Sequence, residues 1–428
     1  MTGIKHFLTF ILAAALLVGS LTLSALIPKT SIRGNMLESA EFLTANKQFG
    51  SVIPGIAASK IDRYADAILL GIAWQYDAGD PLKSVMRSAY YHDPKTGENK
   101  NLLSAVEEDL PANQQYLRYW HGSIALVRPL LLLLPVTGIY ALNAVMLAAL
   151  TLWLVLSLLR KKAFYAAGGI LAGLAAVSIW FVPLSLEYTW TCLLSLALSL
   201  AALQLASRKK YGVCTFFFLI TGMMTSFLDF LTTETLTLTL PLLLLLRELH
   251  REKPGTAPRL LPFAGTSVLS WGAGYGGMWA LKWLLASAVL GENVLPYVSG
   301  HIGERLYGDV FGVDQFRLLT GAVTRNIGCL FPLGYGPIGA IAGIFLTLAA
   351  AYYAYVYRRK GYDRVLLFAY AAAGLLPYLR YLVLHNHSFI HYFFTFRAQA
   401  AAILAAALML EELRERSRSD HGGRRQKK

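Results

Sequence analysis

Histidines and arginines cluster at 380–397, a region that contains the sequence HNHSFIHYFFTFR between two apolar runs. Arg380, His387 and His391 are spaced by seven and four positions, so on one continuous helix they would lie within about 40° of each other. Guanidinium and imidazole groups that converge at a membrane surface suit phosphate oxygens, and Arg397 adds a further cation. A zinc site built on His-x-His and a third histidine is an alternative, as is structural hydrogen bonding among buried histidines.

Carboxylates that could act as a general base occur in ASKIDRYADAILLGIAWQYD, residues 58–77. Its apolar spacing predicts an amphipathic helix, on which Asp62 and Asp66 lie about 40° apart at one border of the apolar stripe. A helix on the membrane surface would present both to a substrate at the bilayer edge, or they simply form its solvated side. Glu38 and Glu41, in NMLESAEFL, are rival acids.

Other ionisable residues stand within or beside apolar runs, where charges are costly unless they pair, reach water or bind a ligand. Asp229 and Glu234 occur in TSFLDFLTTETLTLTLP, and Glu234 could instead cap the following helix. Arg128 precedes a proline in YLRYWHGSIALVRPLLLLLP, and Lys282 lies in GGMWALKWLL. Arg128 can bind an anion or extend to the interface, and Lys282 can extend outward or pair with one of these acids. His121 stands at an expected turn beside the water boundary.

The elements that must position these residues are long apolar helices. The chain of 428 residues is 56% hydrophobic and 15% charged, with a mean hydropathy of +0.48. A helix needs roughly 20 apolar residues to cross a bilayer. The sequence therefore predicts an all-α polytopic membrane protein with about ten transmembrane helices, at 6–28, 138–159, 163–183, 188–206, 212–231, 235–246, 262–290, 338–357, 365–384 and 391–410.

Basic loops predict the orientation of these spans. RKK at 160–162, SRKK at 207–210, RELHREK at 247–253 and YRRKGYDR at 357–364 follow alternate spans, which places them and both termini in the cytoplasm. We expect one transmembrane domain, 1–410, with outer loops at 29–123 and about 291–337, and a basic cytoplasmic tail at 411–428. The second outer loop carries His301, Glu304, Arg305, Arg317 and Arg325, and attraction to an anionic ligand would explain this basic excess.

The net charge of +14 follows from this loop pattern and does not indicate nucleic acid binding, because the cations are dispersed among membrane loops. The short basic loops favour a bacterial plasma membrane. The first apolar run exceeds a usual signal-peptide core, so we expect a retained anchor rather than a cleaved peptide. In GAGYGGM at 272–278, Gly272 and Gly276 are expected to allow close helix packing rather than to bind a nucleotide.

The combined pattern resembles the GT-C class of membrane glycosyltransferases. The features that match are the large loop after the first span, the acid-bearing helix within it, and HNHSFIHYFFTFR at the last outer turn. FLDFLTT at 227–233, and YWHG followed by RPLLLL, are also similar to motifs of bacterial membrane proteins loosely associated with this class. Many members have an adjacent acid pair directly after the first span, and this chain has none there.

The resemblance implies transfer of a sugar from a polyprenyl-phosphate carrier to an acceptor outside the cytoplasm, in cell-envelope biosynthesis. Asp62 or Asp66, and otherwise Glu38 or Glu41, would be the base. Arg380, His387, His391 and Arg397 would bind the departing phosphate, supported by Arg128, Lys282 and His121, while Asp229 and Glu234 could bind the sugar or a divalent metal ion. A transporter or lipid flippase, and a non-catalytic envelope-assembly protein, remain alternatives that also contact membrane lipids.

Overall fold

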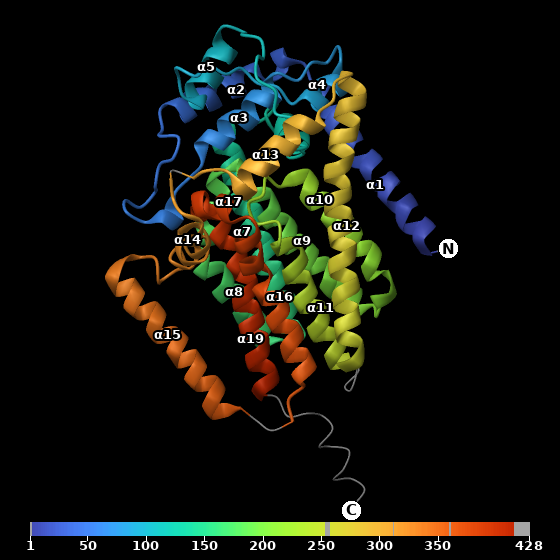
Figure 1. Ribbon diagram of the computed structural model, residues 1–428, viewed down its shortest axis with the longest axis vertical. Coiled ribbons are helices and arrows are strands. Elements are labelled where there is room, and N and C mark those ends of the chain that lie inside the picture. The colour runs from blue at the N-terminus through green and yellow to red at the C-terminus, as the bar shows by residue number, and fades with distance from the viewer. Residues whose placement is uncertain (1, 253–256, 311, 359–360, 415–428) are drawn as a thin grey trace, which may run out of the picture.

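The computed structural model describes residues 2–252, 257–310, 312–358 and 361–414, and within these ranges the chain is all-helical, with no β-strand. Long helices run side by side along the longest axis (Figure 1). Residues 29–123, which we call the crown, cover one end of this bundle with short helices. Most of the predicted basic tail, residues 415–428, lies outside the described residues.

Seven stretches of the described residues are long and apolar enough to cross a membrane, which is fewer than the ten expected. The predicted run 163–183 is divided between a short helix, α8 (Phe164–Ala176), and a 3₁₀ helix at Ile179–Leu184. Run 235–246 lies in α11 (Leu236–Glu252), which ends in charged residues, and run 262–290 lies in α12 (Ala257–Leu290), whose glycines and serines lower its hydropathy. The seven stretches are Gly3–Ala25 in α1 (Thr2–Ala25), α7 (Val136–Arg160), α9 (Leu186–Ser207), Tyr211–Leu228 with α10 (Cys214–Leu228), α15 (Gly336–Tyr357), α16 (Arg364–Val383), and Tyr392–Arg414, which ends in α19 (Ala400–Arg414).

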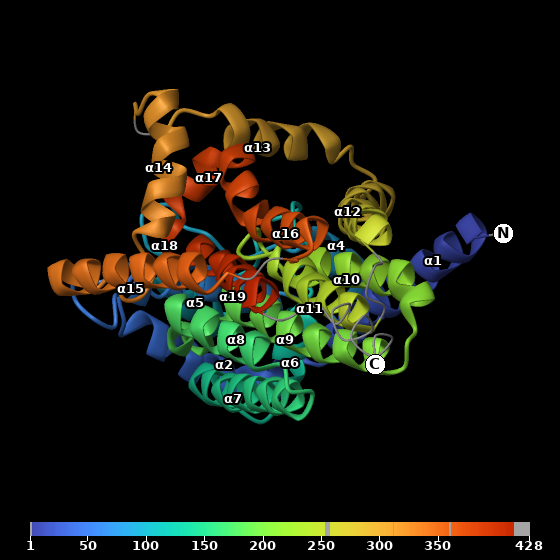
Figure 2. The same ribbon diagram turned by 90° about the horizontal axis from the view of Figure 1, so that it is seen from below.

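The outermost helices expose apolar side chains in a way that suits lipid. Seen from below, α1 and α15 extend outwards on opposite sides of the bundle (Figure 2). Leu16 on α1 is 67% exposed and Ile341 on α15 is 70% exposed. No residue in the apolar window of α15 is buried. Continuous apolar surface of this kind is unusual in soluble monomers, so the seven apolar helices are compatible with a multi-pass membrane protein.

The helices α10 and α12 pack closely against each other, and small residues allow this approach. A Cβ atom at Gly222 of α10 would lie 2.0 Å from the carbonyl oxygen of Trp271, and one at Gly274 of α12 would lie 2.0 Å from that of Leu219. The expectation for Gly272 and Gly276 was wrong, because a Cβ atom at either position would meet nothing within 4 Å. The glycine that faces α10 is the one between them.

The crown contains α2 (Lys29–Thr44), α3 (Arg63–Trp74), α4 (Pro81–Arg87) and α5 (Glu98–Glu107), followed by α6 (Ile124–Leu130). The predicted amphipathic helix at 58–77 forms only from Arg63 onwards, and nine of its residues, Asp66–Trp74, are buried. It does not lie exposed on a membrane surface. Because α2, α5 and α9 pack around α3, even its polar stripe is inside the protein.

The chain between Arg380 and Arg397 is not one continuous helix. Helix α16 ends at Val383, α17 spans His385–Ile390, α18 spans Tyr392–Thr395, and a 3₁₀ helix at Phe396–Gln399 leads into α19. Leu384 and His391 leave helical geometry between these segments. Helices α13 (Leu295–Tyr307) and α14 (Gln315–Ile327) form an arc beside α16 and α17 (Figure 2). These short helices, together with the crown, surround the site described next.

Candidate functional site

A cavity of about 360 Å³ lies between the crown, α9, α13 and the short helices α17 and α18. We call it the crown cavity. It brings together side chains that are far apart in the sequence, and its lining includes Asp62, Arg118, His121, His301, His387 and His391. Tyrosine and phenylalanine rings make up much of the remaining wall. The arrangement provides the buried carboxylate of Asp62, the half-buried carboxylate of Glu187, several imidazoles and a guanidinium in a single partly enclosed space.

Asp62 is the only one of the four predicted base candidates that lines this cavity. It is the N-cap of α3, where one carboxylate oxygen accepts a hydrogen bond from the Ala65 amide at 2.9 Å. The Asp62 amide donates to the Tyr188 hydroxyl, which in turn donates to the Lys60 carbonyl at 3.2 Å. Only 3% of Asp62 is exposed, and burial raises its pKa to about 6. A carboxylate with a pKa near neutrality is well matched to accepting a proton from a hydroxyl.

Asp66 lies one turn further along α3 but faces away from the cavity, into the protein. Its carboxylate accepts hydrogen bonds from the Leu186 amide at 2.8 Å, the Ser185 hydroxyl at 3.1 Å and the Tyr140 hydroxyl. Ser185 is the N-cap of α9, so Asp66 holds the first turn of α9 against the crown. Its geometry is that of a structural anchor.

The rival acids Glu38 and Glu41 lie exposed on α2 and do not contribute to the crown cavity. Asp229 is buried, but it caps the chain after α10, where it accepts hydrogen bonds from the Thr191 hydroxyl at 2.9 Å and the Thr232 hydroxyl at 2.5 Å. These three acids are therefore not directed at the same space as Asp62.

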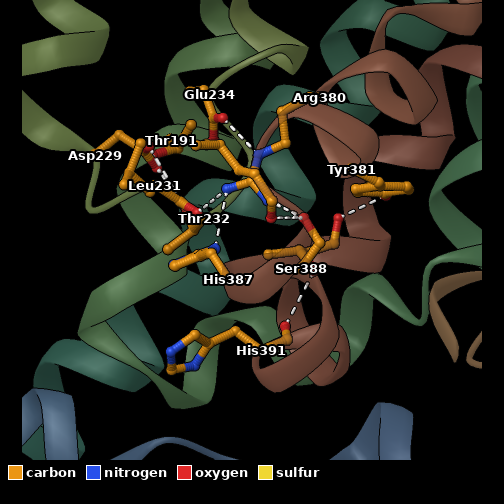
Figure 3. A network of polar contacts seen from close by, with 12 residues as sticks. Thr191, Asp229, Leu231, Thr232, Glu234, Arg380, Tyr381, His387, Ser388 and His391 are labelled. Atoms are coloured by element: carbon orange, nitrogen blue, oxygen red, sulfur yellow. Dashed lines mark hydrogen bonds and ion pairs between the residues drawn. The ribbon is translucent and has the colours of Figure 1, made fainter. Parts of the chain in front are cut away.

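The buried ion pair between Arg380 and Glu234 lies next to His387 (Figure 3). Arg380 donates from Nε to Glu234 at 2.7 Å, and from its other nitrogens to the Ser388 hydroxyl at 2.8 Å and the Leu231 carbonyl at 2.5 Å. It also lies 3.3 Å from Nδ1 of His387. Because a guanidinium can only donate, Nδ1 of His387 is the acceptor and its ring proton is on Nε2. Arg380 and Glu234 thus act as positioning residues for an imidazole of the cavity.

The other predicted histidines complete this wall. The rings of His387 and His391 have centroids 4.6 Å apart, so the two come together although no continuous helix connects them. His121 is in the left-handed region at φ 52°, with its ring 4.8 Å from that of Tyr116. Burial, followed by the nearby charge of Lys282, lowers the pKa of His121 to about 3. His121 is therefore neutral at physiological pH.

Sequence reasoning missed Arg118, which lies at a junction between the crown cavity and a second, apolar space. This apolar groove has a volume of about 160 Å³ and is lined by side chains such as Leu231, Val298 and Leu306. Arg118, Tyr119 and His301 line both spaces. The guanidinium of Arg118 lies 4.7 Å from the Tyr116 ring centroid, and no ion pair among the described residues involves it. Its position in YLRYWHG, beside aromatic residues, was the available signal.

Three predicted phosphate-binding cations instead hold the backbone together. Arg128 is fully buried and donates to the carbonyls of Ala73 and Ile27 at 2.7 and 2.5 Å. Lys282 donates to the carbonyls of Val85 and Met86 at the end of α4, at 3.1 and 3.0 Å. Carbonyls at a helix end are normal partners for such cations.

Arg397, the third of these cations, lies 4.7 Å from the Tyr188 ring centroid and donates to the Ala58 carbonyl at 3.2 Å. Arg397 and Tyr188 therefore hold the segment that leads into Asp62. The three cations do not line the crown cavity. They bind backbone carbonyls of the segments that surround it.

The described residues contain no group of three or more histidine, cysteine, aspartate or glutamate side chains placed to hold a metal ion. The predicted histidine cluster therefore lacks the geometry of a zinc site in this part of the chain. Comparison of the chain with family models, curated proteins and solved structures gives no match.

Proposed function

We propose that the chain is a GT-C-like membrane glycosyltransferase, which moves a sugar from a polyprenyl-phosphate carrier to an extracytoplasmic acceptor. One observation carries the proposal: a cavity with a buried carboxylate lies beside an apolar groove, and Arg118, Tyr119 and His301 line both spaces. A lipid-linked sugar has the same two parts, with a polar head and an apolar tail joined by a phosphate. Arg118 at the junction is positioned for the phosphate, because guanidinium groups bind its oxygens in a bidentate manner.

In this reaction Asp62 accepts the proton of an acceptor hydroxyl. The acceptor oxygen forms a bond to the anomeric carbon of the sugar, and the bond between that carbon and the phosphate oxygen breaks. The electron pair of the broken bond leaves with the phosphate, whose charge changes from about −1 to about −2. Arg118 stabilises this added charge from the wall of a partly enclosed cavity, where such interactions are stronger than in open water. His387 and His391 supply polar groups beside the sugar.

The placement of the cavity favours a transferase over the alternatives. Transporters bind their substrate near the middle of the membrane, between repeated halves with broken helices. The crown cavity is instead lined by the crown and by short helices at one end of the bundle. A non-catalytic assembly protein would not need a buried carboxylate with a raised pKa inside a cavity.

Sugar transfer by the purified full chain tests the proposal. The protein is reconstituted in liposomes with a panel of radiolabelled polyprenyl-phosphate sugars and candidate acceptors, as wild type and as Asp62→Asn. Asparagine caps helices as well as aspartate, so the fold is kept while the base is lost. We expect a drop in turnover of about 10² to 10⁴-fold, which is typical for removal of a general base.

Glu41→Gln is the matched control, because Glu41 is an exposed acid of the crown outside the cavity. Its turnover should equal that of the wild type. Equal turnover in Asp62→Asn would remove Asp62 as the base, and absence of transfer with every donor would favour the transporter or the assembly protein.

A further inference from the structure

Two cations lie on aromatic rings beside the crown cavity, which one of these rings, Phe49, helps to line. They have no role in the reaction described above. The ammonium of Lys60 is 4.9 Å from the ring centroid of Phe49 and 4.4 Å from that of Phe393. The guanidinium of Arg325, on α14, is 4.3 Å from the Phe389 ring and 3.9 Å from the Tyr392 ring. We call these two cations and their four rings the rim patch.

The two halves of the rim patch are adjacent. The rings of Tyr392 and Phe393 are neighbours in α18, with centroids 6.2 Å apart. Arg325 lies over the Tyr392 ring and Lys60 lies over the Phe393 ring, so both cations contact the same short helix. Glycine at position 321 makes this approach of α14 possible, because a Cβ atom there would lie 2.5 Å from the Phe389 ring.

Neither cation is neutralised by an ion pair. No ion pair within 4.0 Å among the described residues involves Lys60 or Arg325. Burial is the main reason that the pKa of Lys60 is lowered, Asp62 opposes this change, and the charge of Arg325 adds to it. The two cations therefore repel each other on a partly desolvated aromatic surface. An anion bound beside both would relieve this repulsion.

The rim patch contacts a different part of the cavity wall from the apolar groove. Phe49 lines the cavity and is 43% exposed, whereas the groove joins the cavity through Arg118, Tyr119 and His301. If the lipid-linked donor occupies the groove side, the rim patch lies where a second substrate can reach Asp62. The exposed ring of Phe49 provides apolar area for the C–H face of a sugar, and the adjacent cations attract negative charge.

We propose that Lys60 and Arg325, with their four aromatic rings, bind an anionic group of the acceptor, which makes the acceptor an acidic glycan. The identification as acceptor rests on the proposed function, but the binding of acidic glycans does not. Charge complementarity selects this occupant, because carboxylates spaced along a glycan can pair with both cations while its sugar rings cover Phe49.

Binding is measured with fluorescent hyaluronan hexasaccharide, which has a carboxylate on every second sugar, and with neutral maltohexaose. The full chain is held in phosphatidylcholine nanodiscs. We expect the acidic hexasaccharide to bind more tightly than the neutral one and to weaken as salt is added. Lys60→Gln and Arg325→Gln should each weaken its binding by about 10- to 100-fold, as expected for loss of a charge-assisted hydrogen bond.

Two variants control for general effects. Arg317→Gln removes an exposed arginine of the same helix, α14, which pairs with Asp314 at 3.2 Å, and should bind as the wild type does. Lys60→Arg keeps the charge and should retain binding. Asp62→Asn should still bind the acidic hexasaccharide more tightly than the neutral one, because both cations remain, and this separates failure of this inference from failure of the proposed reaction.

Equal affinity for both hexasaccharides, or unchanged affinity in Lys60→Gln and Arg325→Gln, would overturn the inference. A membrane headgroup is the competing occupant. In that case the two variants would bind the acidic hexasaccharide as Arg317→Gln does, and would instead lose any preference of the protein for spin-labelled phosphatidylglycerol over phosphatidylcholine.

Discussion

Asp62 and Asp66 are four positions apart in the sequence and end in different environments. Asp62 precedes the first turn of α3, where the extended segment before the helix turns its carboxylate towards the cavity. Asp66 is inside the helix and meets the first turn of α9. On one continuous helix, a separation of four residues would place both side chains on the same face. The chain becomes helical only at Arg63, so that geometry does not apply to Asp62.

The raised pKa of Asp62 predicts the pH dependence of turnover. The base must be ionised, and burial raises its pKa from 3.8 to about 6. The value of kcat/KM, which reports pKa values of the substrate-free protein, should therefore rise as the pH increases through about 6 and should level off above it. Initial rates measured across this range in the wild type check the prediction, and a flat profile would contradict it. The residual activity of Asp62→Asn should lack this rise.

The raised pKa of Asp62 makes folding stability change with pH in the opposite direction to turnover. A carboxyl whose pKa is raised on folding holds its proton more tightly in the folded state. Its stabilising contribution to the free energy of unfolding is therefore fully present below pH 3.8 and is lost as the pH rises through about 6. The melting temperature of the wild type should therefore fall relative to that of Asp62→Asn over this window. Activity and stability at Asp62 thus change in opposite directions with pH.

At the scale of elements, breaks between helices bring the site together. Arg380 is at the end of α16, His387 is in α17, and His391 lies between α17 and α18. The turn at Leu384 folds α17 back so that the guanidinium of Arg380 reaches Nδ1 of His387. The ion pair with Glu234 fixes this turn against the loop after α10. An unbroken helix would have placed the side chains on one face without this support.

The contact between α10 and α12 predicts a sharp difference between neighbouring glycines. In Gly274→Ala the added methyl group would lie 2.0 Å from the Leu219 carbonyl oxygen, so the helices must separate. Overpacking of this kind typically costs about 1–3 kcal/mol, and we expect a lower melting temperature in detergent.

Gly272→Ala is the matched substitution in the same helix. Nothing lies within 4 Å of its added methyl group, and alanine is a better helix former than glycine by about 1 kcal/mol. Its melting temperature should stay equal or rise. A similar loss in both variants would show that the close contact of α10 and α12 does not control stability.

At the scale of the whole molecule, the predicted orientation can be tested with cysteine labelling. The three native cysteines are buried, so background labelling should be low. A cysteine at Glu108, exposed in the crown, should react with an impermeant maleimide in intact cells. A cysteine at Arg208, in a predicted cytoplasmic loop, should react only after lysis. The reverse pattern would place the crown cavity on the cytoplasmic side and would exclude an extracytoplasmic reaction.

The sequence by itself predicted the apolar helices, and these are compatible with a membrane environment. Runs of apolar residues of bilayer length have one stable conformation in lipid, the helix, because no water is present to bond an open backbone. Seven predicted runs accordingly appear as long apolar helices. Interrupted or partly polar runs such as 163–183 and 262–290 were less certain, since their ends depend on the neighbours that bury them.

Only the tertiary structure decided which charges face a common space. Asp62, Arg118, His301 and His387 come from four separate segments, and local spacing contains no information on which of them share a cavity. Arg128 and Lys282 fit the same sequence pattern as a binding cation, but each is directed at backbone carbonyls that belong to distant residues. A buried charge takes the nearest partner that satisfies it. The long-range fold selects that partner, and thereby separates the charges that hold the protein together from those available to a substrate.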